Sequence, residues 1–219
     1  MPSRAVRPRV RSENTRSAIL QAAEAIFAQR GFAATRVEDV AAQVGIRRPS
    51  IVYHFRDKRD LYEAVLDDVF GGLLGRIQSV LDKRAPLADR IEATVGAWVS
   101  YVGGRPSLAG ILLREVAEAS SVRSPAATRH VGPIITAVEN ALREGQQEGA
   151  LEPIDPIHFI FAVAGATLFF VAGTPALAPG WPFDPLSPAQ LRTHEAELLE
   201  MTRRWLGIRQ PRLARSPKR

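Results

Sequence analysis

The chain has 219 residues, 46% of them hydrophobic, so it can bury a substantial core and is not a disordered protein. It contains no cysteine, which excludes a disulfide framework and a thiolate metal site. The net charge of +6 is concentrated at the ends: residues 1–16 hold five arginines and one acid, and residues 203–219 hold seven basic side chains and no acid. Because residues 17–202 therefore carry a net charge of −5, the high pI does not indicate nucleic-acid binding over the whole surface.

The N-terminus shows no signal-peptide pattern. The most apolar run, residues 157–172, contains His158 and is 16 residues long, whereas a membrane span needs about 20. We therefore expect a cytoplasmic protein that does not contact a membrane.

Residues 1–11 lack apolar periodicity and are predicted to form a disordered basic arm, which is either a solvated tail or a DNA-contacting arm. Residues 208–219 are expected to form a second disordered basic tail. Between them, apolar residues at helical spacing predict a first helix from about residue 12 or 14 to residue 29, closed by Gly31.

Residues 35–58 predict two short helices joined by a glycine turn. Thr35 and Glu38 have the spacing of a capping box, and Gly45 suits the left-handed residue that ends a helix. The second helix, at about residues 47–55, has a polar face with basic, hydroxyl and aromatic side chains. These are the parts of a helix-turn-helix DNA reader, and the local excess of seven basic residues over three acids in residues 30–59 suits phosphate contact.

Helical spacing continues to residue 206. A helix of about 24 residues is expected after Asp57, with Gly71 and Gly72 marking either a kink or a close packing contact. Five further helices are expected, near residues 87–102, 106–116, 131–142, 157–172 and 188–206. The prediction is an all-α protein of about nine helices, with a three-helix head and a larger helical-bundle body.

A pattern of apolar, glycine and aromatic positions runs through residues 12–72. Its members are Ile19, Leu20, Ala22, Ala23, Phe27, Gly31, Phe32, Thr35, Val37, Val40, Ala41, Val44, Gly45, Ile46, Ser50, Ile51, Tyr53, His54, Phe55, Lys58 and Leu61. With these residues the segment resembles the DNA-binding domain of the tetracycline-repressor (TetR) family. The resemblance implies a homodimeric transcriptional regulator, usually a repressor, that a small apolar or amphipathic effector releases from a palindromic operator.

By the same resemblance, contacts with double-stranded DNA would fall on the helix-turn-helix. The candidate residues are Thr35, Arg47, Arg48, Pro49, Ser50, Tyr53, His54 and Lys58. Thr35 would hold a phosphate, Arg48 would read a guanine edge, and the last three would contact the DNA backbone. Val52 and Arg47 depart from the family pattern, which often has a tyrosine and a capping serine there, so we expect an operator that differs from the standard one.

Residues 73–207 are expected to bind the effector and to form the dimer. The candidate pocket residues are Trp98, Tyr101, Leu112 and Val138, with ordinary core packing as the alternative. The resemblance implies that the last two helices pair with those of a second subunit. Candidate interface residues are Phe161, Ala162, Gly165, Phe169, Leu198 and Trp205, and the alternative is burial of these helices within one subunit.

Other functions find little support in the sequence. His130, His158 and His194 share no ligand spacing, so we expect neither a metal nor a cofactor. Nucleophile signatures and glycine-rich phosphate loops are absent, so we expect no enzyme activity. The remaining alternative is a ligand-binding adaptor protein whose head contacts another protein, which the salt dependence of DNA binding would distinguish.

Overall fold

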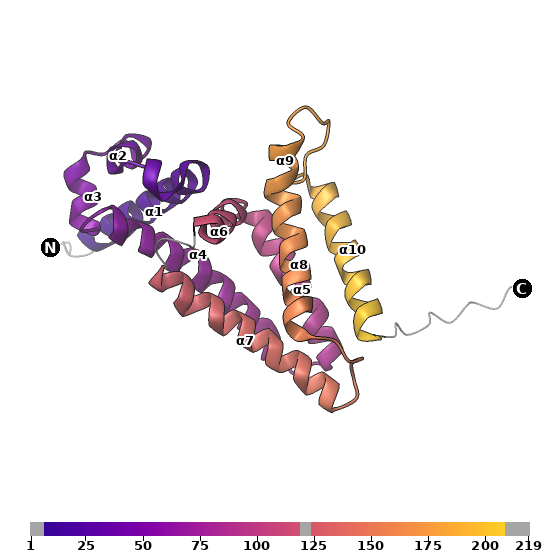
Figure 1. Cartoon of the computed structure of the whole chain (residues 1–219). Helices are drawn as coiled ribbons and strands as arrows, with labels where there is room; N and C mark the ends of the chain where they lie inside the picture. Colours follow the sequence, from indigo (N-terminus) through magenta and orange to yellow (C-terminus); the bar gives the residue numbers. More distant parts are fainter. Residues whose placement is uncertain (1–6, 119–123, 209–219) are drawn as a thin grey trace, which may run out of the picture.

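Figure 1 shows the computed structural model of the chain, which describes residues 7–118 and 124–208. In chain order its helices are α1 (Arg7–Ala34), α2 (Val37–Val44), α3 (Arg48–His54), α4 (Lys58–Leu81), α5 (Leu87–Gly104), α6 (Ser107–Glu118), α7 (Pro125–Gln147), α8 (Pro156–Leu168), the π-helical turn η1 (Phe169–Gly173), α9 (Thr174–Leu177) and α10 (Pro188–Leu206). Because α8, η1 and α9 follow one another without a break, these residues form nine helical rods and no strand. The predicted all-α fold is confirmed.

The helices are arranged along one long direction (Figure 1). The helices α1, α2 and α3 form the head at one end, and α8 and α10 stand side by side at the other. Between them, α4 and α7 pack against each other along most of their length. The head packs on α4 and α6, whereas α8 and α10 are reached through α5 and α7.

The first helix differs from its prediction at the start. It begins at Arg7, so residues 7–11 of the predicted arm are helical, and residues 1–6 lie outside the described part of the chain. Residues 209–219 of the predicted tail lie outside it as well. At the other end Gly31 has φ 76° and ψ 174°, a combination open mainly to glycine, so the helix is broken where the sequence predicted.

The predicted capping box at the start of α2 is wrong. The N-cap is Arg36, whose side chain makes no capping bond. Thr35 instead donates its hydroxyl to the carbonyl of Gly31 at 2.7 Å, and only 1% of the residue is exposed. Because the break at Gly31 takes that carbonyl out of the regular helix, a nearby buried hydroxyl bonds to it.

Other predicted helix ends are confirmed. Gly45 ends α2 in the left-handed conformation, and Gly207 ends α10 in the same way. The N-caps of α4, α8 and α10 are Asp57, Asp155 and Ser187, and each side chain accepts a bond from the backbone N–H three residues later. These ends depend on residues within one helical turn, which is why their spacing in the sequence predicts them.

The glycine pair in α4 marks a close packing contact and not a kink, since α4 is one helix of 24 residues. A Cβ atom on Gly72 would lie 2.6 Å from the hydroxyl oxygen of Tyr101 in α5. That hydroxyl donates to the carbonyl of Val69 at 2.7 Å, so the tyrosine reaches the backbone of α4. The missing side chain at Gly72 lets α5 approach α4 at this point.

The core consists of two clusters that meet along α4. The first contains α4 residues up to Phe70 together with the head, and it includes Leu108 and Ile111 from α6. The second begins at Leu73 and fills the body. Arg114 of α6 donates to the carbonyls of Ala28 and Gln29 at 3.1 and 2.7 Å, which attaches α6 to the end of α1. The head is therefore held by the body as well as by its own small core.

Candidate nucleic-acid interface and body surfaces

The helix α3 is held by two apolar side chains and exposes the rest of its length. Ile51 and Phe55, at the end of the helix, are buried in the first cluster. Tyr53 is 81% exposed, and Val52 next to it is half exposed. The exposed set consists of Arg47, Arg48, Pro49, Ser50, Val52 and Tyr53. One face of α3 thus presents cations, a hydroxyl, an aromatic ring and an apolar side chain together.

Arg48, the residue predicted to read a base, has an intramolecular partner. Its Nε lies 3.2 Å from Oε1 of Glu38 on α2, and both side chains are more than half exposed. An exposed ion pair of this kind contributes only about 0–1 kcal/mol. The pair can therefore be exchanged for a contact with DNA at little cost, and it holds Arg48 against α2 until then.

An arginine without a side-chain capping bond begins both helices of the motif. Arg36 is the N-cap of α2 and Arg47 that of α3, and both are exposed. A cation at the positive end of a helix is unfavourable on its own, but the free backbone N–H groups there attract phosphate. Arg36 is absent from the predicted contact set. The sequence does show a basic residue directly after Thr35, but the predicted capping box assigned the start of the helix to Thr35 and left Arg36 without a role.

The other predicted DNA-contact residues are oriented differently. The side chain of Thr35 is buried, as described above, and His54 is half buried with its ring edge-on to Tyr53. Lys58 directs its ammonium group at three carbonyls, those of Phe32, Ala33 and Thr35, at 2.9, 3.2 and 3.1 Å. Since an ammonium group has three donors, this arrangement uses all of them. Thr35 and Lys58 therefore fix the path from α1 to α2 in this structure.

The rod formed by α8, η1 and α9 exposes an apolar stripe. Phe161 is 60% exposed and Phe169 is 58% exposed, and Ala162 and Gly165 between them are exposed as well. These residues recur at steps of about four and so share one face. Trp205 of α10 is also part-exposed, and its ring lies edge-on to Phe159 at 6.1 Å between centroids.

Leu198, which was predicted to lie at the interface, is only 3% exposed and belongs to the second core cluster, so it is not part of the exposed face of α10. It faces inward because α10 packs on α5 within the same chain. The sequence alone did not distinguish the two faces of α10.

The same rod runs from Pro156 to Leu177, 22 residues, and is long and apolar enough to cross a membrane by length and composition. The apolar run of 16 residues that the sequence showed is therefore only part of this longer rod. The helix continues through η1, where the N–H of Thr174 bonds to the carbonyl of Phe169, and on past Pro175. Only 28% of its most apolar window is buried within the chain, so most of this surface is available to a partner.

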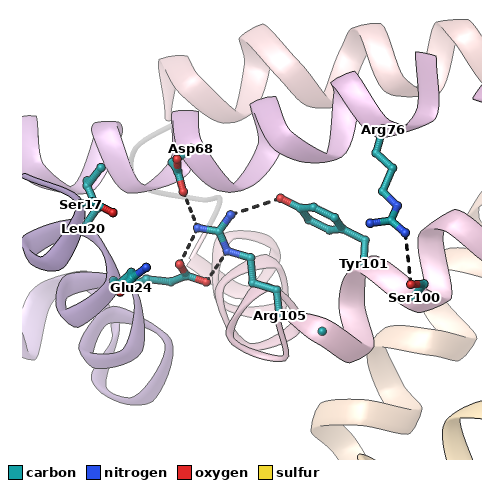
Figure 2. A pocket seen from close by; sticks show the side chains of 10 residues that line it. Ser17, Leu20, Glu24, Asp68, Arg76, Ser100, Tyr101 and Arg105 are labelled. Carbon is teal, nitrogen blue, oxygen red and sulfur yellow. Dashed lines mark hydrogen bonds and ion pairs between the residues drawn. The ribbon is translucent and has the colours of Figure 1, made fainter. Parts of the chain in front are cut away.

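The four residues predicted to line an effector pocket belong to different parts of the core. Val138 is buried in the second cluster and Leu112 packs against the first, while Trp98 and Tyr101 contact both. A cavity of about 590 Å³ lies instead between α1, α4 and α5, and only Tyr101 of the predicted set lines it. Figure 2 shows this cavity, which we call the α1–α4–α5 groove. Its lining includes Ser17, Leu20, Gln21, Glu24, Asp68, Arg76, Ser100 and Arg105.

Arg105, directly after α5, joins the head to the body inside this groove (Figure 2). Its guanidinium donates to both carboxylate oxygens of Glu24 in α1, at 2.8 and 2.6 Å, and to Asp68 in α4 at 2.5 Å. A fourth bond goes to the hydroxyl of Tyr101 at 3.2 Å. The hydrogen bonds that Arg105 donates to Glu24 raise the pKa of the arginine further above its usual range, although burial acts in the opposite direction. The arginine therefore remains charged at any working pH.

Sequence reasoning missed this network because its members lie far apart in the chain. Glu24 and Arg105 are separated by 81 residues. Each residue taken singly is typical of a solvated helix face.

Among the described residues no group of three metal-ligating side chains occurs.

Two family models match this chain, and together they cover the head and the body. Residues 19–65 match the family described as bacterial regulatory proteins, tetR family. Residues 88–202 match the tetracyclin repressor-like C-terminal domain. The chain belongs to the TetR family.

Curated relatives in this family are transcriptional regulators. The HTH-type transcriptional regulator RutR of Escherichia coli K12 is 27% identical over 160 residues, which are 73% of this chain and 75% of RutR. The HTH-type transcriptional repressor KstR2 of Mycolicibacterium smegmatis is 43% identical over 67 residues, 31% of this chain and 33% of KstR2. The solved structure of AibR in complex with isovaleryl coenzyme A and operator DNA has a TM-score of 0.67 at 18% identity, and the match covers 85% of this chain and 97% of AibR.

These matches make the chain a DNA-binding transcriptional regulator with a helix-turn-helix head. The relatives named here are regulators and not enzymes. The similarity to AibR is at low identity and shows the fold alone.

Proposed function

We propose that this TetR-family regulator is a cytoplasmic homodimeric repressor, which binds a palindromic operator and is released by a small amphipathic effector. The observation that carries the proposal is the contrast between the two ends of the molecule. An exposed, cationic α3 lies at one end, and an exposed apolar face of α8 and α10 lies at the other. The first suits DNA and the second suits another copy of the chain.

The proposed dimer is supported by the apolar stripe on α8. Phe161 and Phe169 are too exposed for a chain that works alone in water, because each side chain would gain about 1.5–3 kcal/mol on full burial. Ala162 and Gly165 between them are small and would let a second helix approach closely. A two-fold axis through this face would pair α8 and α10 with their copies, so that both chains bury the same residues. Burial by a second copy also accounts for this surface without a membrane.

The mode of DNA binding follows from α3. In a two-fold dimer the two α3 helices would enter successive major grooves, about one helical turn apart, and would so require a palindrome. Arg48 is the proposed base reader, and Arg47, Ser50 and Tyr53 are proposed to contact the backbone. Pro49 and His54 lie on the same short helix and complete the proposed surface. Thr35 and Lys58 contribute by fixing the geometry around α2, and Val52 offers an apolar surface to a thymine methyl.

Repression and release are supported by the relatives and by the attachment of the head. KstR2, whose segment is 43% identical to part of this chain, is a repressor, and AibR binds isovaleryl coenzyme A. In this chain Arg105 and Arg114 connect α1 to the body. A ligand that shifts α5 or α6 would therefore move the head and change the spacing of the two reading helices.

The test begins with selection of bound sequences from a random DNA pool, followed by gel shifts at fixed salt. We expect an inverted repeat to be selected and Arg48→Ala to weaken its binding by about 5- to 150-fold, which corresponds to about 1–3 kcal/mol for a base contact. Arg143→Ala is the matched control, because Arg143 is an exposed, ion-paired arginine in the body. Equal affinity of Arg48→Ala and wild-type protein would contradict the reading role.

A salt series on the same complex tests the adaptor alternative. Phosphate contacts make affinity fall steeply as salt rises, because binding releases counterions. An affinity that does not change between about 50 and 200 mM salt would favour the adaptor.

A further inference from the structure

The α1–α4–α5 groove runs along one face of α4. Asp68, Gly72 and Arg76 are spaced four residues apart, so they follow one another along that face over about 12 Å. The side chain of Tyr101 lies between the two charged ends, and its hydroxyl lies at Gly72 (Figure 2). The volume of about 590 Å³ is within the range of sites that bind small molecules.

The two arginines of the groove differ in what they can still bind. Arg105 donates four hydrogen bonds, to Glu24, Asp68 and Tyr101, so little of its guanidinium is free. Arg76 makes one side-chain bond within the described residues, to the hydroxyl of Ser100 at 3.3 Å, and no carboxylate lies within ion-pair distance of it. Arg76 is therefore the cation of this groove that is available to a ligand.

We propose that the α1–α4–α5 groove binds a small amphipathic monoanion, whose charged group is held by the guanidinium of Arg76. Leu20 and the ring of Tyr101 supply apolar contact, and Gln21 supplies an amide for a polar substituent. We expect a ligand with a single negative charge, because Glu24 and Asp68 already balance the two arginines of the groove and a second anionic group would have no cation of its own. A nucleotide-bearing ligand with several phosphates does not fit these charges.

The position of the groove gives such a ligand a regulatory effect. Ser17, Gln21 and Glu24 belong to α1 in the head, whereas Ser100 and Tyr101 belong to α5 in the body. A molecule bound between them stabilises one placement of α1 relative to α5, and can shift the equilibrium only by its difference in affinity between placements. This regulatory effect rests on the proposed function, whereas binding itself does not.

The probe for binding is 4-bromobenzoate, with the neutral 4-bromobenzamide as its counterpart, titrated calorimetrically into the full chain. We expect 4-bromobenzoate to bind and the amide to bind at least about tenfold more weakly, since a charge-assisted bond is lost. Arg76→Gln should weaken 4-bromobenzoate binding by a similar factor. Arg84→Gln, at an exposed arginine outside the groove, should leave it unchanged. Both are surface substitutions, so circular dichroism should show folded protein.

Crystals grown with the probe locate the site through the anomalous signal of bromine. We expect the carboxylate at Arg76 and the bromine inside the groove, beside the ring of Tyr101. The proposal is wrong if wild-type and Arg76→Gln proteins bind 4-bromobenzoate equally or not at all, or if the bromine lies outside the groove.

Gel shifts then separate the site from its regulatory effect. We expect 4-bromobenzoate to change the DNA affinity of wild-type protein but not of Arg76→Gln. Binding in the groove without any change in DNA affinity would overturn the regulatory effect and leave the ligand site. Failure of the unliganded protein to bind DNA would instead contradict the proposed function.

Discussion

The exposed faces of α3 and α8 differ in the polarity of the side chains that they present to water. On α3 the apolar anchors Ile51 and Phe55 are buried and the exposed residues are largely charged or polar. On α8 the exposed residues include Phe161 and Phe169, which water solvates poorly. The α3 face is well solvated without a partner, whereas the apolar side chains of the α8 face are stabilised when a partner covers them. In the proposed dimer the partner at the head is exchangeable and the partner at the body is permanent.

The largest effect is expected from a charge placed in the α8 stripe. Phe161→Asp should convert the proposed dimer to a monomer and reduce operator affinity by 100-fold or more, on the order of the 2–5 kcal/mol that a buried unpaired charge costs. Because a two-fold interface contains the residue twice, the cost is counted twice. Light scattering coupled to size exclusion measures the mass.

Val116→Asp is the control, since Val116 is an exposed apolar residue on α6 and not on the stripe. It should leave the mass unchanged. A Phe161→Asp protein that remains dimeric would remove the contrast between the two faces.

The next effect is expected where the two regions are joined. Arg105→Met leaves the carboxylate of Glu24, only 6% exposed, without its main partner, which should cost about 2–4 kcal/mol of unfolding free energy in urea. The double variant with Glu24→Gln should recover part of this loss. Operator affinity should fall as well, because α1 loses its attachment to α5.

Arg203→Met is the matched control, because Arg203 pairs with Glu92 at 2.6 Å entirely within the body. It should destabilise the protein without changing the DNA affinity measured on folded protein. Equal effects of the two arginine variants on DNA binding would show that Arg105 does not position the head.

A smaller effect is expected on the α3 face itself. Glu38→Gln releases Arg48 from its ion pair and should tighten DNA binding by up to about fivefold, the equivalent of an exposed pair worth at most about 1 kcal/mol. Glu139→Gln, which releases Arg143 in the body, should have no effect on DNA binding. Weaker binding by Glu38→Gln in gel shifts would mean that the pair orients Arg48 productively.

The smallest effect concerns pH at the junction of the α8 rod with α10. Burial lowers the pKa of His194, whose ring stacks on Phe170 at 4.2 Å. The unfolded chain then binds the proton more readily, so stability is full above pH about 6.5 and falls as the pH drops below it. In urea titrations, His194→Gln should lose less stability than wild-type protein between pH 7.5 and 5.5. Parallel losses in both proteins would assign the pH dependence to other groups.

Several features of the head depend on tertiary contacts, which the spacing of residues in the sequence does not reveal. Lys58 was predicted to bind phosphate, yet it reaches the carbonyl of Phe32, 26 residues earlier in the chain. Thr35 was predicted to cap a helix, and it turns inward because Gly31 breaks α1 just before it. Arg48 and Tyr53, by contrast, lie exposed on α3 as predicted, since burial of Ile51 sets the orientation of so short a helix.

The sequence by itself determined the all-α class, the long α4 and the helix ends at Gly45, Asp57, Asp155 and Ser187. Each depends on residues within one or two turns, so local spacing suffices. The tertiary structure decided which face of α10 is buried, how far the α8 rod extends and where a cavity forms. These features arise where helices from distant parts of the chain meet, and the residues that meet there share no pattern in sequence.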